Sequence, residues 1–421
     1  MELKQRASIT NSILFYVAIF STMPILRVSS NSFFKITVII LAAILVINSI
    51  IIKKSIDLKY IDKYYLFVYL IKIFTVIGAI YYSWGLSWKR GAIIQFFWFS
   101  VYTVLYILIS NRGEKLIKTF RKGIIVSIYI QIAWSFIQII LNKLFSIDIN
   151  TIVFTNILSM VSEASQSKYG QLNISGLAWH PINMAPVLII AYCMFNKIYM
   201  KFIIIFLAIT TNNSTVLIGL IVCVVLDIFF ALRRMNKKKK TIKYTTLFVI
   251  FISVVVIIFV LLKTDFINKL ISSFTYLYGR ITGKFYDGGS TAARIRYYTS
   301  LPEIFKLSSI YQILFGYGEG CSGYLMSVLF NQYTHLSSWA VECDVINILI
   351  GNGVLGFILF YWWLIKIVIK GLNIDKRYLI CTVSLIICGI TYNVQYDWVI
   401  IFEMFMVLSI KYNYNIFKIK M

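Results

Sequence analysis

The sequence is too apolar to be that of a soluble protein. It has 421 residues, of which 60% are hydrophobic and 14% charged, and its mean hydropathy is +0.82. Soluble domains contain about 45–50% apolar and about 25% charged residues. Apolar stretches of about 18 residues or more recur along the whole chain, as they do in proteins that cross a bilayer many times. We therefore expect an all-α polytopic integral membrane protein.

The distribution of charge predicts the topology. Hydropathy indicates about twelve transmembrane helices, centred near residues 20, 43, 74, 100, 132, 188, 206, 224, 253, 361, 386 and 405. If the N-terminus is cytoplasmic, 27 of the 41 Lys and Arg residues fall in cytoplasmic segments and 12 on the opposite side, in agreement with the positive-inside rule. We expect a multi-pass protein of the inner (cytoplasmic) membrane with both termini in the cytoplasm. The basic run at 233–243 is interpreted as a contact with anionic lipids, not with nucleic acid.

The predicted helices fall into three parts. Residues 1–262 hold nine transmembrane helices with short loops, 263–352 form one large, mostly helical extracytoplasmic loop, and 353–421 hold the C-terminal transmembrane helices. The first helix is expected within Ser12–Val28, which no signal-peptide cleavage site follows. The large loop is too long for a passive connection. Its pattern predicts helices over 265–278, 291–309 and 337–350, with Pro302 starting a second helix in the middle segment.

The large loop contains the side chains best suited to catalysis. Arginine binds phosphate oxygens in a bidentate manner, and a carboxylate or an imidazole can remove a proton from a hydroxyl group. Glu342 and Asp344 lie in an otherwise apolar run, where acidic residues are costly and usually functional. His335 would share a helical face with Glu342 if one helix held both. The alternative is a solvated or interfacial charge, which is favoured for Arg280 and Glu319. The candidates are Arg280, Arg294, Arg296, His335, Glu342 and Asp344.

Other polar residues lie at or within the predicted spans. His180 and Asn183 stand at the outer start of a span, where His180 either contacts a ligand or caps the helix. Snorkelling or helix packing is the interpretation for Lys35, Lys72, Asp227 and Glu403. The GxGxxG match at Gly318–Gly323 is interpreted as a tight turn, because no βαβ unit surrounds it. His and acidic residues show no metal-ligand spacing, so we expect neither a metal nor another cofactor.

Several short motifs follow one another in a characteristic order. They are Gly176-Leu-Ala-Trp-His180-Pro-Ile-Asn183, Asn213-Ser214-Thr215, Ser290-Thr-Ala-Ala-Arg294, Phe315-Gly-Tyr-Gly318, Glu342-Cys-Asp344 and Gly353-Val-Leu-Gly356. Across roughly residues 170–365 this order resembles the Wzy-type O-antigen and capsular polysaccharide polymerases, which are related to the O-antigen ligases. Many members of that family carry an Arg in the earlier outer loop, where this chain has Gln171, Leu172 and Asn173. The resemblance then implies that the later loop supplies most of the positive charge.

The resemblance implies a glycosyltransferase. It would transfer a growing glycan from a polyprenyl pyrophosphate carrier to a sugar of a second lipid-linked repeat unit, on the outer face of the membrane. The pyrophosphate would bind to Arg280, Arg294 and Arg296. The base that deprotonates the acceptor hydroxyl would be His335, Glu342 or Asp344, and the glycan would contact His180 and Asn183. The implied partners are this lipid-linked glycan, membrane lipids, a flippase and a chain-length regulator, without nucleic acid.

Two alternatives remain at this point. An O-antigen ligase would use the same chemistry with a different acceptor. A glycan or solute transporter is compatible with about twelve spans. The large loop with its Arg and acidic residues favours an enzyme over a transporter.

The predicted topology can be tested by cysteine labelling. A cysteine introduced at Gly288 should react with a membrane-impermeant maleimide in intact cells, because the large loop is expected outside. A cysteine introduced at Thr241, in the basic run, should react only after permeabilisation. The wild-type chain, with its six native cysteines, gives the background. Reaction at Gly288 only after permeabilisation would reverse the whole topology.

Overall fold

A computed structural model describes most of the chain. The described residues are 2–28, 31–51, 62–82, 86–160, 167–168, 171–211, 213–237, 297–330, 341, 343–395 and 397–418. The chain divides into two compact units, of which the first comprises Met1–Val224 and Ser308–Met421 and the second Val225–Leu307. The candidate site lies within the first unit.

Helices dominate the described residues. Those before residue 238 are α1 (Glu2–Ser21), α2 (Phe33–Ile51), α3 (Lys63–Tyr82), α4 (Leu86–Ser110), α5 (Glu114–Phe145), α6 (Met184–Met194), α7 (Ile198–Thr210) and α8 (Ser214–Lys237). Those after residue 296 are α12 (Leu301–Leu307), α13 (Ile310–Phe315), α14 (Ser322–Phe330), α15 (Asp344–Leu372), α16 (Arg377–Thr391) and α17 (Asp397–Lys411). The short elements are the π-helix η2 (Thr151–Ile157), the 3-10 helix η3 (Pro181–Asn183) and the antiparallel pairs β1–β2 (Arg27–Val28, Asn31–Ser32) and β3–β4 (Ser167–Lys168, Gln171–Leu172).

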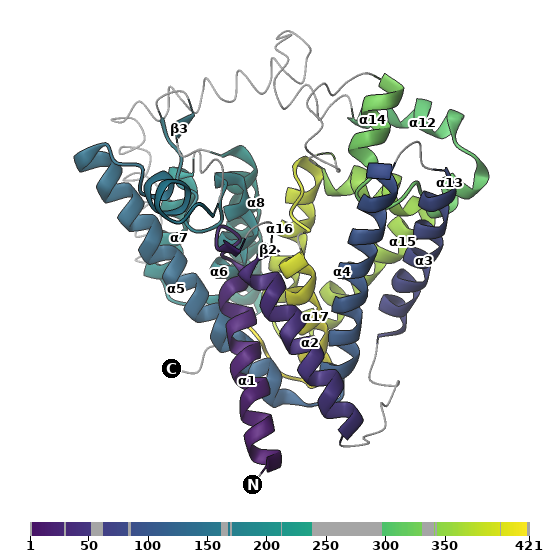
Figure 1. Cartoon of the computed structure of the whole chain (residues 1–421). Coiled ribbons are helices and arrows are strands. Elements are labelled where there is room, and N and C mark those ends of the chain that lie inside the picture. The colour runs from purple at the N-terminus through teal and green to yellow at the C-terminus, as the bar shows by residue number, and fades with distance from the viewer. Residues whose placement is uncertain are drawn as a thin grey trace. The chain divides into compact units, whose positions relative to one another are not determined.

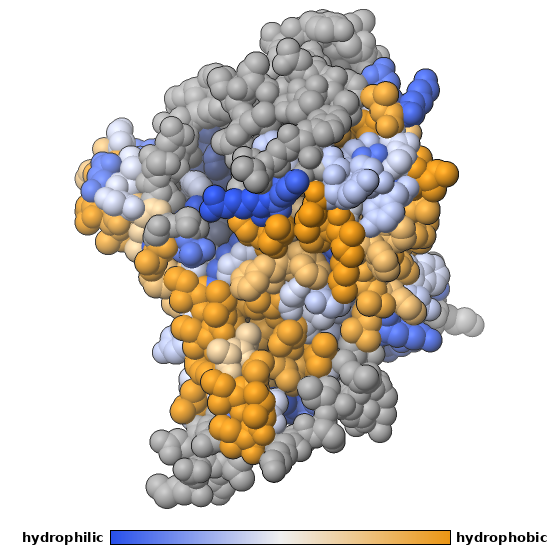
Figure 2. Space-filling view, turned by 45° about the vertical axis from the view of Figure 1, so that its right-hand side comes forward, coloured by the Kyte–Doolittle hydropathy of each residue, from blue (hydrophilic) through white to orange (hydrophobic). Residues whose placement is uncertain are grey.

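The described helices are those of a membrane protein. Within these residues six are long and apolar enough to cross a bilayer: α2, α3, most of α4, α5, most of α8, and α15. They leave large apolar side chains exposed, among them Ile50, Ile77 and Ile358, and Figure 2 shows such side chains gathered over a broad area of one face. Exposed aliphatic side chains on long helices suit contact with lipid tails. The expectation of an all-α membrane protein is confirmed at this level.

Several boundaries differ from the sequence-based expectations. Eleven of the twelve predicted span centres fall in a described helix, and the one near residue 253 lies outside the described residues. Twelve full spans are not confirmed, because α6 and α7 have only 11 and 13 residues, about 16–20 Å of helix. The first span was expected to reach Val28 but ends at Ser21, because Pro24 and the β1–β2 hairpin follow it. Pro302 lies in the first turn of α12, as expected.

The predicted helix over 337–350 is described as a helix from Asp344 onward. Cys343 precedes it in an extended conformation with φ −159°. His335 and Glu342, which would share a helical face if one helix held both, lie outside the described residues, so that expectation stays a prediction.

The first unit is organised around two groups of packed helices. α1 packs against α2 and α5, and α15 packs against α3, α13 and α16 (Figure 1). α17 contacts α4, α5 and α15 and so joins the two groups. Buried aromatic rings fill the contacts, for example Phe120 of α5 stacked on Phe405 of α17 at 3.8 Å between ring centroids.

α15 is interrupted at Gly353, which has φ 67° and ψ −176°. This conformation is essentially restricted to glycine. The turn Gly316–Gly320, which follows α13, packs into the interruption, and its three glycines all have positive φ. A Cβ atom at Gly353 would collide with backbone atoms of Leu314 and Gly316. The glycines are therefore required by close backbone approach at both sides of the contact.

Backbone hydrogen bonds close this interruption. The N–H groups of Tyr317 and Gly318 donate to the carbonyl oxygens of Ile350 and Gly351 at 2.9 and 3.1 Å. Two side chains of the neighbouring helices also donate to the turn: Thr75 Oγ1 to the Phe315 oxygen at 2.7 Å, and Trp88 Nε1 to the Tyr317 oxygen at 3.0 Å. Backbone polar groups at membrane depth need such partners, because lipid offers none.

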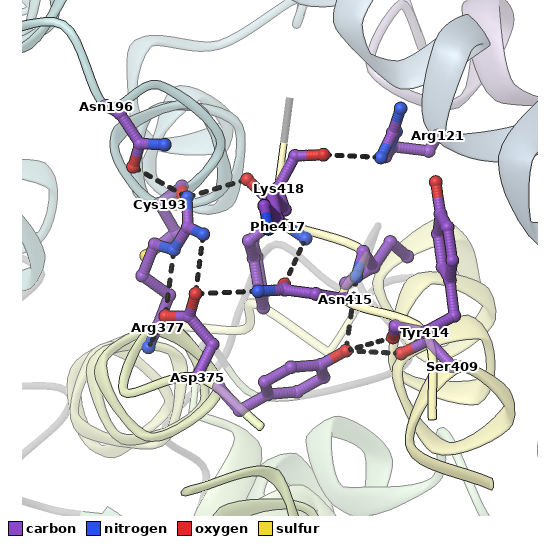
Figure 3. Close-up of polar contacts among 12 residues, drawn as sticks. Arg121, Cys193, Asn196, Asp375, Arg377, Ser409, Tyr414, Asn415, Phe417 and Lys418 are labelled. Atoms are coloured by element: carbon purple, nitrogen blue, oxygen red, sulfur yellow. Dashed lines mark hydrogen bonds and ion pairs between the residues drawn. The ribbon is translucent and has the colours of Figure 1, made fainter. Parts of the chain in front are cut away.

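A second polar cluster holds the C-terminal segment (Figure 3). Arg377, at the start of α16, donates two hydrogen bonds to Asp375, at 2.9 and 2.6 Å, and one each to Asn196 Oδ1 and the Phe417 carbonyl oxygen, at 2.7 and 2.6 Å. Burial alone would raise the pKa of Asp375, but hydrogen bonds from Arg377 and Asn415 outweigh it and hold the pKa below its ordinary value. This cluster ties residues 415–417 to α16 and to the connection between α6 and α7.

Substitution of Gly353 tests the closure of α15. Gly353→Ala should lower the free energy of unfolding by more than about 3 kcal/mol, because the methyl group meets backbone atoms and the conformation itself is strained. Gly113 has nearly the same conformation, φ 85° and ψ −176°, with nothing within 4 Å of its Cβ position. Gly113→Ala is therefore the matched control and should cost only the backbone strain. Thermal unfolding of the purified protein measures both, and equal losses would show that the contact at Gly353 is loose.

Candidate functional site

A cavity of about 560 Å³ lies among the helices of the first unit. Its lining comes from α1–α4, α6, α15 and α17 and from the segments that join them. The ionisable side chains of the lining are Arg27, Lys35, Lys72, His180, Glu319 and Asp344. The carboxamide side chains are Gln95, Asn183, Asn347, Asn352, Asn393 and Gln395. So many polar groups between apolar helices indicate a binding site, because intramembrane polar residues are costly without a function.

Three of the eight candidate residues from the sequence line this cavity. Asp344, His180 and Asn183 come from α15 and from the start of η3 and α6, and the fold brings them to one cavity. The other five candidates lie outside the described residues: Arg280, Arg294, Arg296, His335 and Glu342. Their expected roles stay predictions.

Asp344 is buried, with 3% of its surface exposed. Its Oδ2 atom accepts hydrogen bonds from the backbone N–H groups of Val394 and Gln395, at 2.8 and 3.1 Å. Gln395 in turn donates through Nε2 to Glu403 Oε1 at 3.2 Å. Asp344 thus fixes the segment between α16 and α17, which itself lines the cavity. Glu403 is fully buried, which agrees with its interpretation as a helix-packing residue.

The segment that carries His180 is fixed by carboxamides. Gln131 Oε1 accepts from the Leu177 N–H at 2.8 Å, and Gln138 Oε1 accepts from the Gly176 N–H at 2.9 Å. Asn150 Nδ2 donates to the Gly176 carbonyl oxygen at 2.8 Å. Three carboxamide side chains thus fix the backbone on the buried side of this segment.

His180 and Asn183 follow directly on that segment. His180 occupies the N-cap position of η3 with an extended backbone, its side chain is exposed, and that side chain makes no capping hydrogen bond. Asn183 Nδ2 donates to the Ala178 carbonyl oxygen at 3.1 Å. The structure thus places His180 at the helix start, as considered from the sequence, without a capping hydrogen bond from its side chain.

Lys72 does not snorkel, contrary to one of the two interpretations of the sequence. Its ammonium group forms an ion pair with Glu319, lies 3.4 Å from Asn352 Oδ1 and sits over the Phe99 ring at 4.3 Å from its centroid. The Lys72 side chain is 7% exposed and that of Glu319 29%. Glu319, for which a solvated loop charge was favoured, belongs to the turn that closes α15. The pair therefore joins α3 to that turn at the cavity wall.

Two further cations of the lining were missed. Arg27, on β1, was not considered, and Lys35, in the first turn of α2, was interpreted like Lys72. The sequence did contain a signal for the lysines, since both lie within predicted spans, where charge is costly. Arg27 carried the same signal, because the predicted first span extended over Ser12–Val28, whereas Glu319 lies in a polar connection. Within the described part of the chain, no group of three or more His, Cys, Asp or Glu side chains could hold a metal ion.

Comparisons with known proteins do not assign the site. No protein-family model matches the chain, and no curated protein matches it significantly. The function is therefore argued from the chemistry of the cavity together with the order of the motifs.

The ion pair between Lys72 and Glu319 should be strongly coupled. Lys72→Met or Glu319→Gln alone should each destabilise the protein by about 2 kcal/mol or more, because each leaves a charge in a poorly solvated place. The double variant should lose less than the sum of the two single variants. Thermal unfolding of the four proteins completes the cycle. Additive losses would mean that solvent already screens the pair.

Proposed function

We propose that the protein is a polysaccharide polymerase that joins lipid-linked oligosaccharide repeat units at the outer face of the cytoplasmic membrane. Its substrate would be a glycan carried on polyprenyl pyrophosphate, and its product a longer glycan of the O-antigen or capsule type. The large loop at 263–352 would lie outside and both termini inside. An O-antigen ligase, which differs in the acceptor, is the nearest alternative within the same chemistry.

The observation that carries this proposal is the composition of the cavity. It combines cations, carboxylates and carboxamides with aromatic rings, including Phe99, Tyr392 and Trp398. Carboxamides offer both a donor and an acceptor, which suits sugar hydroxyl groups, and cations suit the pyrophosphate. About 560 Å³ falls within the range of small-molecule sites, about 300–1,000 Å³.

The contacts between the motifs also support the proposal. The motif Phe315–Gly318 packs against the interruption at Gly353, the first residue of the next glycine motif. Asp344, from the acidic motif, and His180, from the earliest motif, line one cavity. Motifs far apart in the sequence that meet around one polar cavity are the arrangement expected if they act on one substrate.

The reaction requires an acid–base group and an anion site. The acceptor hydroxyl oxygen bonds to the anomeric carbon of the donor while the bond from that carbon to the pyrophosphate oxygen breaks. The proton of the hydroxyl passes to a base, and polyprenyl pyrophosphate leaves with the electron pair. Asp344, with Glu342 and His335, is proposed to supply the base. Arg280, Arg294 and Arg296 are proposed to stabilise the charge of the leaving group.

A transporter of an anionic glycan is the second candidate, and one observation favours it. Transporters place substrate sites at interrupted helices, and α15 is interrupted at Gly353 beside Asn352, which lines the cavity. A transporter binds and releases its substrate unchanged, so it breaks no bond between the glycan and its carrier. The two functions therefore differ in the intermediate that accumulates when the site is impaired.

Asp344→Asn distinguishes the enzyme from the transporter. The amide keeps the volume and an acceptor for the 394–395 backbone but cannot take a proton, so we expect polymer to fall by about 10²-fold or more. Single lipid-linked repeat units should then accumulate on the outer face, where an added glycosidase cleaves them. A transporter predicts units that stay protected on the inner face. Glycan profiles from cells with and without the glycosidase provide the measurement.

Glu403→Gln is the matched control for this substitution. Glu403 is also buried and bonds to the same segment through Gln395, but it does not line the described cavity. Polymer formation should persist in Glu403→Gln at a normal protein level. If Asp344→Asn polymerised as well as the control, Asp344 would be a packing residue and not part of the base.

A further inference from the structure

We infer that Arg27 and Lys35 form an anion-binding subsite of the cavity, which binds the phosphate groups of a lipid-linked substrate. This inference rests on the proposed function and adds the N-terminal hairpin to the site. Both side chains line the cavity, and they come from a part of the chain that precedes every motif discussed above.

The β1–β2 hairpin and the start of the helix that follows it carry the two cations. Arg27 pairs with Ser32 across the hairpin, and the Phe33 N–H donates to the Leu26 carbonyl oxygen at 2.9 Å. α2 begins at Phe33, so Lys35 lies in its first turn, where its N–H lies 3.3 Å from Ser32 Oγ. The N-terminal end of a helix carries a partial positive charge, which adds to that of the two side chains.

The guanidinium group of Arg27 is held in place without neutralisation. Its Nε atom donates to the Pro24 carbonyl oxygen at 3.1 Å, and its Cζ atom lies 3.7 Å from the centre of the Trp179 ring. Among the described residues no carboxylate forms an ion pair with Arg27. The contacts of Arg27 use its Nε atom and the flat face of its guanidinium group. Bidentate recognition of a phosphate also uses the terminal nitrogens of the guanidinium. A cation fixed in this way beside a cavity is suited to an anionic ligand.

Trp179 is itself held in an unusual conformation. Its φ is 72°, which is rare for a bulky residue and is maintained only when the surroundings fix it. They do so here, because the Ile25 N–H donates to the Leu177 carbonyl oxygen at 3.2 Å and a buried apolar cluster joins the two segments. The strained backbone at Trp179 thus accompanies the placement of its ring against Arg27 and next to His180. Strain of this kind is typical of residues that position a ligand.

Lys35 extends the positive charge along the wall. Its ammonium group lies 4.7 Å from the centre of the Trp98 ring. Arg27 and Lys35 are the cations that the N-terminal hairpin and the start of α2 contribute to the lining. A pyrophosphate carries several oxygens and so can accept hydrogen bonds from more than one cationic side chain.

Ligand-induced stabilisation of the purified full-length protein in detergent tests this subsite. The probes are undecaprenyl pyrophosphate, neutral undecaprenol and phosphatidylglycerol. We expect the wild type to be stabilised by the pyrophosphate and not by the other two at equal concentration. Arg27→Gln and Lys35→Gln should each raise the dissociation constant about tenfold or more, and Arg27→Lys should recover part of the loss. Arg90, an exposed arginine of α4 that does not line the cavity, gives the control Arg90→Gln, which should bind normally.

The outcomes separate this inference from the proposed function. If the wild type does not bind undecaprenyl pyrophosphate, the proposed substrate is wrong and the subsite with it. If the wild type binds and both Gln variants bind equally well, only the subsite is wrong. Equal stabilisation by phosphatidylglycerol that the variants abolish would identify a contact with bulk lipid and overturn the inference. The melting temperature without ligand reports folding, and Lys35→Gln decides the matter if Arg27→Gln does not fold.

Discussion

The described fold depends on how the interruption of α15 is satisfied. A helix broken between apolar neighbours leaves backbone groups that lipid cannot solvate, and here the N–H groups of Tyr317 and Gly318 bond to the carbonyl oxygens at residues 350 and 351. Only glycine permits this approach at Gly353. The same turn carries Glu319, whose ion pair with Lys72 reaches across to α3. This backbone contact therefore fixes α15 and the turn Gly316–Gly320 and, through the ion pair, joins them to α3 at the cavity wall.

A second consequence is that the polar wall is supported by residues that do not themselves touch the cavity. Gln138 and Asn150 hold the backbone at Gly176, and Glu403 accepts from Gln395 behind Asp344. Such hydrogen bonds order the side chains and backbone of the wall during folding. Less conformational entropy is then lost when a ligand binds.

The sequence predicted the helices better than the site. Hydropathy located helices near eleven of twelve centres, because each span is a local property of about 20 residues. It misjudged ends where local signals compete, as at Pro24 after α1 and at the extended Cys343 before α15. Of the site residues, Asp344 was identifiable as an acid in an apolar run, and His180 and Asn183 through a motif. Lys72 was noticed but interpreted by itself, without the partner that gives it a role.

Composition, apolar periodicity and the bias of basic residues thus determined that the chain is a helical membrane protein, since these signals act within one helix at a time. What only the tertiary structure decided is which polar residues share a cavity. Lys72 and Glu319 are 247 positions apart, and Arg27 meets Trp179 only because a hydrogen bond and an apolar cluster join two distant connections. A buried charge needs a partner, because desolvation makes an unpaired charge costly. Which residue becomes that partner depends on the packing of the helices and not on proximity in the sequence.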